Sequence, residues 1–289
     1  MKIVKIENLH PQLRVPWTSK EDVFEHFSPE EDAYNEIAKD YEAANPVSAM
    51  LKHIPHFKLD IPEFDHARAW AEVQEIPMDT YSRANLRNYE ETTAKGKVEH
   101  PHWYSNTMVN YTPRSSDCQG KQSKEEAAVA YPEYQENAAK ILGKVPRLNS
   151  VDMNFYETET YAKLPYITNF IKEHIADDTF RMHIWKIKGE GYLNWHNHIK
   201  LPWHSDVIIN DKAIVHIPLY THPDVEMLVN KEGTIYSEHY EVGSSWIFNY
   251  IYDHAVDNPS DVFRCHIVFY VSLSNKKFAD LCLKSSNKQ

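Results

Sequence analysis

The spacing of apolar residues changes near residue 180, and this change constrains the fold more than any other feature of the chain. Beyond it, short runs rich in β-branched and aromatic residues are separated by turn residues such as Gly191 and Gly233. The runs cover residues 180–188, 192–198, 213–221, 234–242, 244–251 and 263–273. Short strands joined by tight turns, with no helix between them, favour an antiparallel sandwich or barrel.

Helical signals lie before these runs. A capping motif at Ser28 opens a helical pattern that Asn45-Pro46 closes. A second capping motif at Ser123 opens another, and a third helix is expected over residues 165–175. The segment 88–122 is polar and aromatic, so we expect a long functional loop or a covering strand there.

These patterns together predict an α+β protein. Residues 1–150 are expected to form a mainly helical and loop covering region, and residues 151–289 to form the β core. No repeat, low-complexity tract or Gly/Ser linker separates the two parts. The boundary is therefore soft, and a single domain fits the sequence as well.

Charge and cysteine content narrow the functional classes. The net charge of −11 argues against binding to the phosphate backbone of a nucleic acid. Cys118, Cys265 and Cys282 are too few and too scattered for a disulfide framework. No apolar run reaches the length of a membrane-spanning helix. We therefore expect a soluble, cytoplasmic protein that makes no membrane contact.

Histidine is over-represented, with 17 residues in the chain, and imidazole is the commonest metal ligand in proteins. His204 and Asp206 lie two residues apart, so an extended segment projects both side chains to the same side. Two histidines and one carboxylate form the ligand set of many non-haem iron(II) oxygenases. His254 is the natural second histidine for such a set.

A second pattern competes with this one. His196 and His198 are also two residues apart on one strand. With His254 they would form an all-imidazole triad, which suits iron, copper or zinc. Spacing alone does not separate the two patterns.

The sequence downstream of these histidines resembles a known family. The pieces that carry the resemblance are His204-Ser205-Asp206, His216-Ile217-Pro218-Leu219, residues 243–249, and His254 followed ten residues later by Arg264. Their order resembles that of the aspartyl/asparaginyl β-hydroxylase-like branch of the iron(II)/2-oxoglutarate oxygenases, which includes free-proline hydroxylases. The resemblance covers residues 165–272. It implies a double-stranded β-helix, a jelly-roll or cupin-like core, with helices packed on one side.

The same resemblance implies roles for individual residues. His204, Asp206 and His254 would hold Fe(II), Arg264 would pair with the distal carboxylate of 2-oxoglutarate, and His216 would contact this cosubstrate. A planar guanidinium suits a carboxylate because it offers two parallel N–H donors. Two plainer interpretations stay open, an internal carboxylate paired with Arg264 and a core role for His216.

One departure from the family pattern affects the ligand assignment. Residues 189–198 also look like the family strand before the metal motif, which would make His196 and His198 the ligands and leave no carboxylate. His204 lies 12 residues before His216, close to the usual family interval, whereas His196 lies 20 before it. We therefore favour His204 and Asp206, with His196 and His198 near the entrance.

The leading hypothesis is an Fe(II)/2-oxoglutarate-dependent dioxygenase. It would use dioxygen to hydroxylate an unactivated C–H of a small molecule or peptide, an amino acid or peptidyl residue, while 2-oxoglutarate is decarboxylated to succinate. The alternatives are a three-histidine cupin-like dioxygenase, a halogenase-like variant without a carboxylate ligand, and a non-enzymatic metal-binding β-sandwich. The last gives no reason for Arg264 at its spacing after His254.

Overall fold

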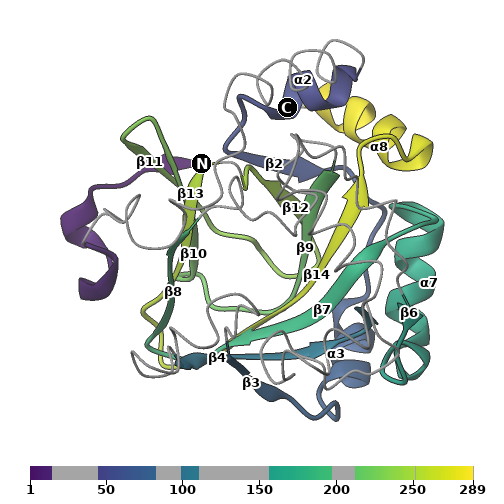
Figure 1. The fold of residues 1–289 in the computed structure, drawn as a ribbon, viewed down its shortest axis with the longest axis horizontal. Coiled ribbons are helices and arrows are strands. Elements are labelled where there is room, and N and C mark those ends of the chain that lie inside the picture. Colours follow the sequence, from purple (N-terminus) through teal and green to yellow (C-terminus); the bar gives the residue numbers. More distant parts are fainter. Residues whose placement is uncertain (15–44, 83–98, 111–155, 197–211, 251, 289) are drawn as a thin grey trace, which may run out of the picture.

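Two antiparallel β-sheets face each other and contain most of the described strands (Figure 1). A computed structural model describes residues 1–14, 45–82, 99–110, 156–196, 212–250 and 252–288. The large sheet has the strand order β2-β12-β9-β14-β7-β4-β3, and the small sheet has the order β1-β11-β10-β13-β8. A further pair joins β5 to β6.

The secondary-structure elements have the following bounds. The strands are β1 Lys2–Ile3, β2 His56–Leu59, β3 Asp79–Ser82, β4 Glu99–Thr107, β5 Val109–Asn110, β6 Tyr156–Glu157, β7 Phe180–Ile187, β8 Gly191–His196, β9 Lys212–Tyr220, β10 Glu226–Lys231, β11 Thr234–Glu238, β12 Ser245–Phe248, β13 Asp253–Asn258 and β14 Arg264–Ser272. The helices are α2 Pro46–Leu51, α3 His66–Val73, α7 Pro165–His174 and α8 Lys276–Ser286, with short 3-10 turns η1 Ile6–Asn8, η2 Pro11–Leu13 and η4 Tyr161–Lys163.

The strands from β7 to β14 form a jelly roll. Along the chain they alternate between the sheets, except that β10 and β11 form a hairpin within the small sheet. The large sheet thereby contains β12-β9-β14-β7 and the small sheet β11-β10-β13-β8. This double Greek-key order is the jelly-roll arrangement. It confirms the β core expected from the sequence.

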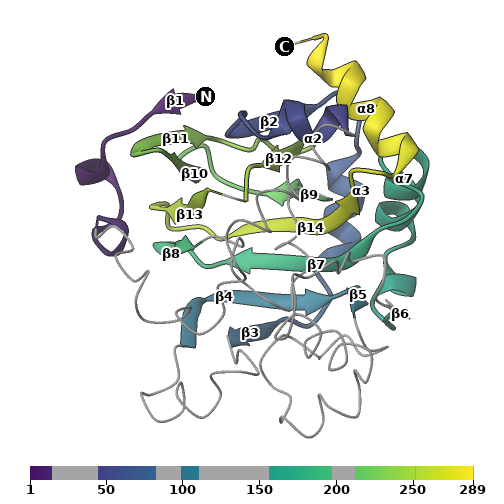
Figure 2. The same cartoon turned by 45° about the horizontal axis from the view of Figure 1, so that its top comes forward.

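Strand β14 shows how the core is divided. Its residues alternate between two buried faces, because a strand projects successive side chains to opposite sides. Val268 and Tyr270 pack between the two sheets. Ile267 and Phe269 pack on the outer side of the large sheet, in a core shared with helices α3, α7 and α8. Figure 2 shows these helices together on that side, as the resemblance implied.

The first part of the chain differs from expectation, because the structure does not confirm a mainly helical covering region. Strands β2, β3 and β4 extend the large sheet, and β1 extends the small sheet. Strand β4 agrees with a covering strand within residues 88–122. The helices expected after Ser28 and Ser123 lie outside the described residues, and the division at residue 150 stays a prediction.

The sequence located most of the later elements and missed three. The expected helix over residues 165–175 is confirmed as α7. The missed elements are β10, β13 and the C-terminal helix α8. Strand β13 is polar for its length, with two aspartates and an asparagine, so it has little β-propensity of its own. Its pairing with both β8 and β10 stabilises it.

The N-terminal segment covers the outer face of the small sheet. Leu9 and Leu13 pack against Leu228 and Ala255 there. The indole Nε1–H of Trp195 donates to the carbonyl of Leu13 at 2.8 Å. These contacts support the end of β8, the strand that leads into the predicted metal-binding segment.

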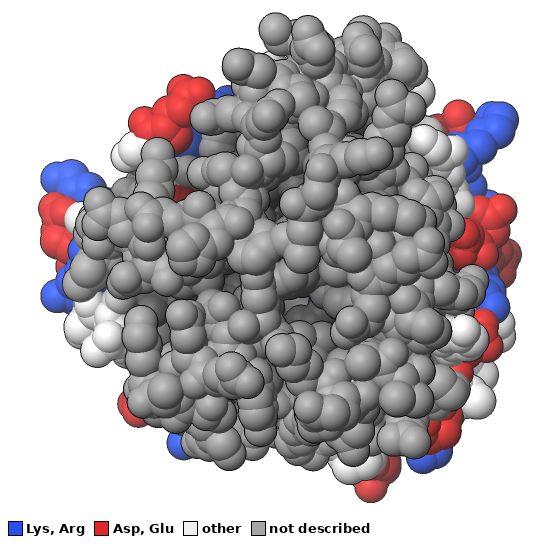
Figure 3. Space-filling view, viewed as in Figure 1, with Lys and Arg blue, Asp and Glu red and all other residues white. Residues whose placement is uncertain are grey.

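The described surface carries charges of both signs. In the space-filling view, Lys and Arg side chains lie interspersed with Asp and Glu around the visible rim (Figure 3). Among the described helices, none combines the length and apolarity required to span a membrane.

Gly189 is expected to be the most sensitive glycine of the core. A Cβ atom at this position would lie 2.3 Å from the carbonyl oxygen of Asp261. We expect Gly189→Ala to lower the free energy of unfolding by about 1–3 kcal/mol, because backbone on both sides must move. Urea unfolding measures this effect. Gly233→Asn is the control, since Gly233 has φ +85° with no atom within 4 Å of such a Cβ, and Asn tolerates this conformation. Equal stabilities of the two variants would contradict the expectation.

Candidate functional site

Three polar side chains lie together on the inner face of the large sheet. Arg264 and His266 are two residues apart on β14 and so share one face of the strand. His216 lies on the neighbouring strand β9. Their exposed fractions are 2%, 1% and 2% respectively. We call these three residues the Arg264 cluster. A polar group of this kind in an apolar interior requires partners, since burial without hydrogen bonds costs several kcal/mol.

Arg264 has few partners within the described part of the protein. One guanidinium nitrogen lies 3.1 Å from Nδ1 of His266. Its Nε is buried and has no hydrogen-bond partner among the described residues. Burial lowers the pKa of Arg264 to about 10, so the side chain remains cationic at neutral pH. An internal carboxylate pairing with this guanidinium is therefore not found among these residues, and the charge suits an anionic ligand.

The two histidines of the cluster contact each other. The Nδ1 atoms of His216 and His266 lie 3.3 Å apart. Burial, and secondly the charge of Arg264, holds the pKa of each imidazole well below its usual value, so both rings are neutral. Each Nε2 atom is buried without a hydrogen-bond partner among the described residues. A core histidine satisfied by backbone, the plainer interpretation of His216, does not describe this arrangement.

Aromatic side chains surround the cluster. The rings of Trp185, Tyr240 and Phe248 each contact the imidazole of His216. Tyr240 also stacks on Trp246, with ring centroids 4.8 Å apart. These rings exclude water, so charges at the cluster act through a low local dielectric.

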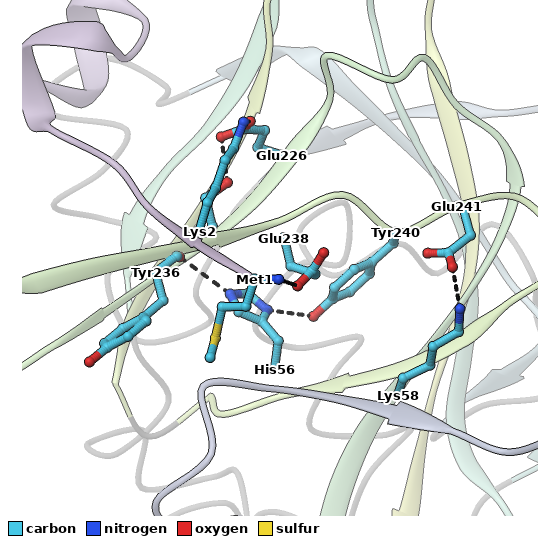
Figure 4. A network of polar contacts seen from close by, with 10 residues as sticks. Met1, Lys2, His56, Lys58, Glu226, Tyr236, Glu238, Tyr240 and Glu241 are labelled. Atoms are coloured by element: carbon cyan, nitrogen blue, oxygen red, sulfur yellow. Dashed lines mark hydrogen bonds and ion pairs between the residues drawn. The ribbon is translucent and has the colours of Figure 1, made fainter. Parts of the chain in front are cut away.

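A strand from the first part of the chain holds Tyr240 in place. His56 on β2 lies 2.9 Å from the Tyr240 hydroxyl through Nδ1 and 3.3 Å from the carbonyl of Tyr236 through Nε2 (Figure 4). The carbonyl only accepts, so Nε2 of His56 donates and Nδ1 accepts from the tyrosine. No local sequence pattern indicates His56 or Tyr240, because their contact joins segments 184 positions apart. His266 could have been found from the sequence, because it lies two residues after Arg264 and therefore on the same face of the strand.

His254 is a buried histidine with a hydrogen bond that fixes its tautomer. It is the second residue of β13 and is 2% exposed. Its Nδ1 lies 2.9 Å from the carbonyl of Tyr252. Because a carbonyl only accepts, Nδ1 carries the proton and Nε2 carries the lone pair, which is the tautomer that metal-binding histidines use. Its ring contacts Phe248, which also contacts His216.

The remaining candidate ligands are placed only in part. His198, His204 and Asp206 lie outside the described residues, in the connection between β8 and β9. The backbone of His196 ends β8 and pairs directly with His254. Both alternative ligand pairs therefore belong to the segment that starts opposite His254, and the choice between them stays a prediction. Within the described residues, no group of three or more His, Cys, Asp and Glu side chains forms a metal site.

Comparisons with known proteins give only distant likenesses. No family model matches the chain, and no curated protein matches by sequence. Among solved structures, an oxidoreductase of the 2OG-Fe(II) oxygenase family from Burkholderia pseudomallei is 12% identical, with coverage of 80% of this chain and 91% of that chain and a TM-score of 0.41. A nickel complex of the non-heme monooxygenase ThoJ is 11% identical, covering 78% and 77%, with a TM-score of 0.37. A cupin domain from Bordetella pertussis is 19% identical, covering 33% and 83%, with a TM-score of 0.24. Likenesses of this size do not assign the chain to a family.

Proposed function

We propose that this protein is an Fe(II)/2-oxoglutarate-dependent dioxygenase that hydroxylates an unactivated C–H of an amino acid or peptidyl residue. The observation that carries the proposal is the buried guanidinium of Arg264, which has no carboxylate partner among the described residues. It lies inside a jelly roll that also buries His254 in a metal-binding tautomer. A buried cation and a metal-binding histidine within one β core suit a cosubstrate that chelates the metal and also carries a negative charge.

Each residue has a defined task in this proposal. His204, Asp206 and His254 would hold Fe(II), the ion that a set of two histidines and one carboxylate suits. Bound iron supplies the oxidation: the substrate C–H gains one oxygen atom, and 2-oxoglutarate becomes succinate and carbon dioxide. Arg264 orients the cosubstrate through its distal carboxylate. The aromatic rings around His216 keep water away from the cluster.

A second candidate is a three-histidine metal dioxygenase, or a halogenase-like variant that lacks the carboxylate ligand. The specific observation in its favour is the direct backbone pairing of His196 with His254. In this alternative His196, His198 and His254 bind the metal, and 2-oxoglutarate is not required by the three-histidine dioxygenase.

The test of the proposed function is spectroscopic. Fe(II) and 2-oxoglutarate are added to the protein without oxygen, and a visible metal-to-ligand charge-transfer band is expected. Succinate, which lacks the 2-oxo acid chelate, serves as the control and should give no band. Absence of a band with 2-oxoglutarate, in protein that has bound iron, would favour the three-histidine alternative. A screen for succinate formation with free amino acids and peptides would then identify the substrate.

Replacement of His254 tests the metal site without turnover. We expect His254→Ala to lose stoichiometric iron while the protein stays folded, because two remaining ligands hold Fe(II) poorly. Metal analysis after anaerobic loading and desalting measures the iron, and circular dichroism reports the fold. His222→Ala is the matched control, since His222 lies in the turn after β9 and its side chain is 40% exposed. Wild-type iron content in His254→Ala would remove His254 from the ligand set.

A further inference from the structure

We propose that Arg181 and Lys212 form an anion-binding subsite on the inner face of the large sheet, and that this subsite binds an acidic group of the substrate. Carboxylate and phosphate share the required chemistry, which is a negative charge carried on oxygen atoms. The inference rests on the proposed function, because it names the class of substrate for the same β core. We call the two residues the Arg181 pair; neither belongs to the Arg264 cluster or to the candidate metal ligands.

A β-bulge directs Arg181 to the inner face. The register between β7 and β14 shifts between Val268 and Tyr270, where β7 contains one extra residue. Phe180 packs between the sheets, and the guanidinium of the next residue, Arg181, also lies 5.1 Å from the centre of the Tyr270 ring. Arg181 has φ +49°, a left-handed conformation that glycine usually supplies. Bulges re-aim side chains beside functional sites, and a strained residue that is not glycine favours a functional role.

Lys212 places a second cation at the same ring. It is the first residue of β9, and Ile214, two residues later, packs between the sheets, so the two share the inner face. The Nζ of Lys212 lies 5.7 Å from the centre of the Tyr270 ring. Lys212 is 3% exposed and Arg181 is 5% exposed. The fold therefore buries two cations against one aromatic side chain.

The energetics of this arrangement favour a bound anion. Contacts with an aromatic face offset only a small part of the cost of burying a charge. Burial, and secondly the charge of Arg181, lowers the pKa of Lys212 well below its usual value. An anion beside both residues would attract each cation and offset their mutual repulsion. An acidic ligand group suits this position better than a neutral one.

Two further polar side chains of β7 extend the subsite toward His216. His183 and Trp185 stack, with ring centroids 5.5 Å apart, and Trp185 also contacts the ring of His216. His183 is 4% exposed. Its Nε2 and the Nε1 of Trp185 are buried without a hydrogen-bond partner among the described residues. Buried polar atoms of this kind require partners, which a polar ligand can supply.

The subsite is separate from the predicted cosubstrate contact. Lys212 and His216 lie four residues apart on β9, which corresponds to roughly 13 Å along the strand. The chain of 2-oxoglutarate is shorter than this separation. One molecule of cosubstrate at the Arg264 cluster therefore leaves the Arg181 pair for a second acidic molecule.

Anion titration measures the subsite directly. Inorganic phosphate and acetate are titrated separately into metal-free protein, and calorimetry records the binding. Arg181→Gln removes the charge and keeps a polar side chain, so we expect it to bind the tighter of the two anions roughly 10- to 100-fold more weakly. Arg181→Lys retains the charge and should recover part of that loss.

Matched variants separate this subsite from other causes of lost binding. Arg68→Gln, the same substitution at an exposed arginine, should leave the anion affinity unchanged. Binding at the Arg181 pair should persist in Arg264→Lys, which identifies the heat that comes from the Arg264 cluster. Lys212→Gln is a second variant that keeps the test valid if replacement of Arg181 unfolds the protein. The unfolding midpoint of each variant without ligand reports a structural defect.

Turnover tests the assignment of the subsite to the substrate. Each acid in the screen for succinate formation is paired with its amide, and the acid should be the better substrate. In Arg181→Gln, the KM for the acid should rise at least roughly tenfold, while the KM for 2-oxoglutarate stays unchanged.

The possible results distinguish this inference from the proposed function. If 2-oxoglutarate gives the charge-transfer band but anion binding is equal in wild type, Arg181→Gln and Lys212→Gln, the subsite is overturned and the proposed function stands. If the band is absent but phosphate or acetate binding depends on Arg181, the proposed function fails and the anion-binding subsite stands. A preference for the amide over the acid would overturn the assignment to the substrate.

Discussion

Arg264→Lys is expected to abolish most 2-oxoglutarate binding even though it retains the positive charge. The guanidinium contacts His266 through one nitrogen and keeps Nε as a second donor in the same plane. A lysine ammonium is a single point donor and cannot reproduce this fork. At a buried site the loss of one partner of a charged pair costs about 2–5 kcal/mol. Replacement of the guanidinium should therefore weaken binding by at least roughly 30-fold.

Anaerobic titration of the Fe(II) protein with 2-oxoglutarate measures this loss. Arg68→Lys is the matched control, because Arg68 is an exposed residue of helix α3 whose guanidinium lies over the Tyr166 ring. That variant should bind 2-oxoglutarate as the wild type does. An unchanged affinity in Arg264→Lys would mean that Arg264 has a structural role, and the cation would no longer support the proposed function.

The second large effect is expected when Asp206 is replaced. If Asp206 is the carboxylate ligand, Asp206→Ala removes a negative charge from the metal site and opens a coordination position. Hydroxylation activity should be lost, and chloride at high concentration is expected to occupy the opened position. His198→Ala should then keep nearly all of its iron and change mainly the affinity for substrate.

The all-imidazole alternative predicts the opposite pair of phenotypes. His198→Ala would lose the metal, and Asp206→Ala would stay active. Iron content and succinate yield of the two purified variants decide the matter, because each alternative predicts a loss in a different protein. An active Asp206→Ala enzyme together with an iron-free His198→Ala protein would overturn the assignment of Asp206.

The local sequence pattern was sufficient to predict the strands that bury apolar side chains. The runs that became β7, β9 and β14 are β-branched and aromatic, and their propensity agrees with their place in the core. The same alternation placed Arg264 and His266 on one face of one strand. Strands β2 and β13 show where this signal ends, since they contain charged or polar residues and depend on pairing with distant strands.

The sequence by itself determined six of the eight jelly-roll strands, all but β10 and β13, and the candidate residues, because periodicity and residue chemistry are local properties. Only the tertiary structure decided which of these residues have partners. It buries Arg264 with no carboxylate partner among the described residues, and joins it to His266 and His216. It also places His56 against Tyr240. Such contacts depend on the register between strands that are far apart in the chain, which no local pattern specifies.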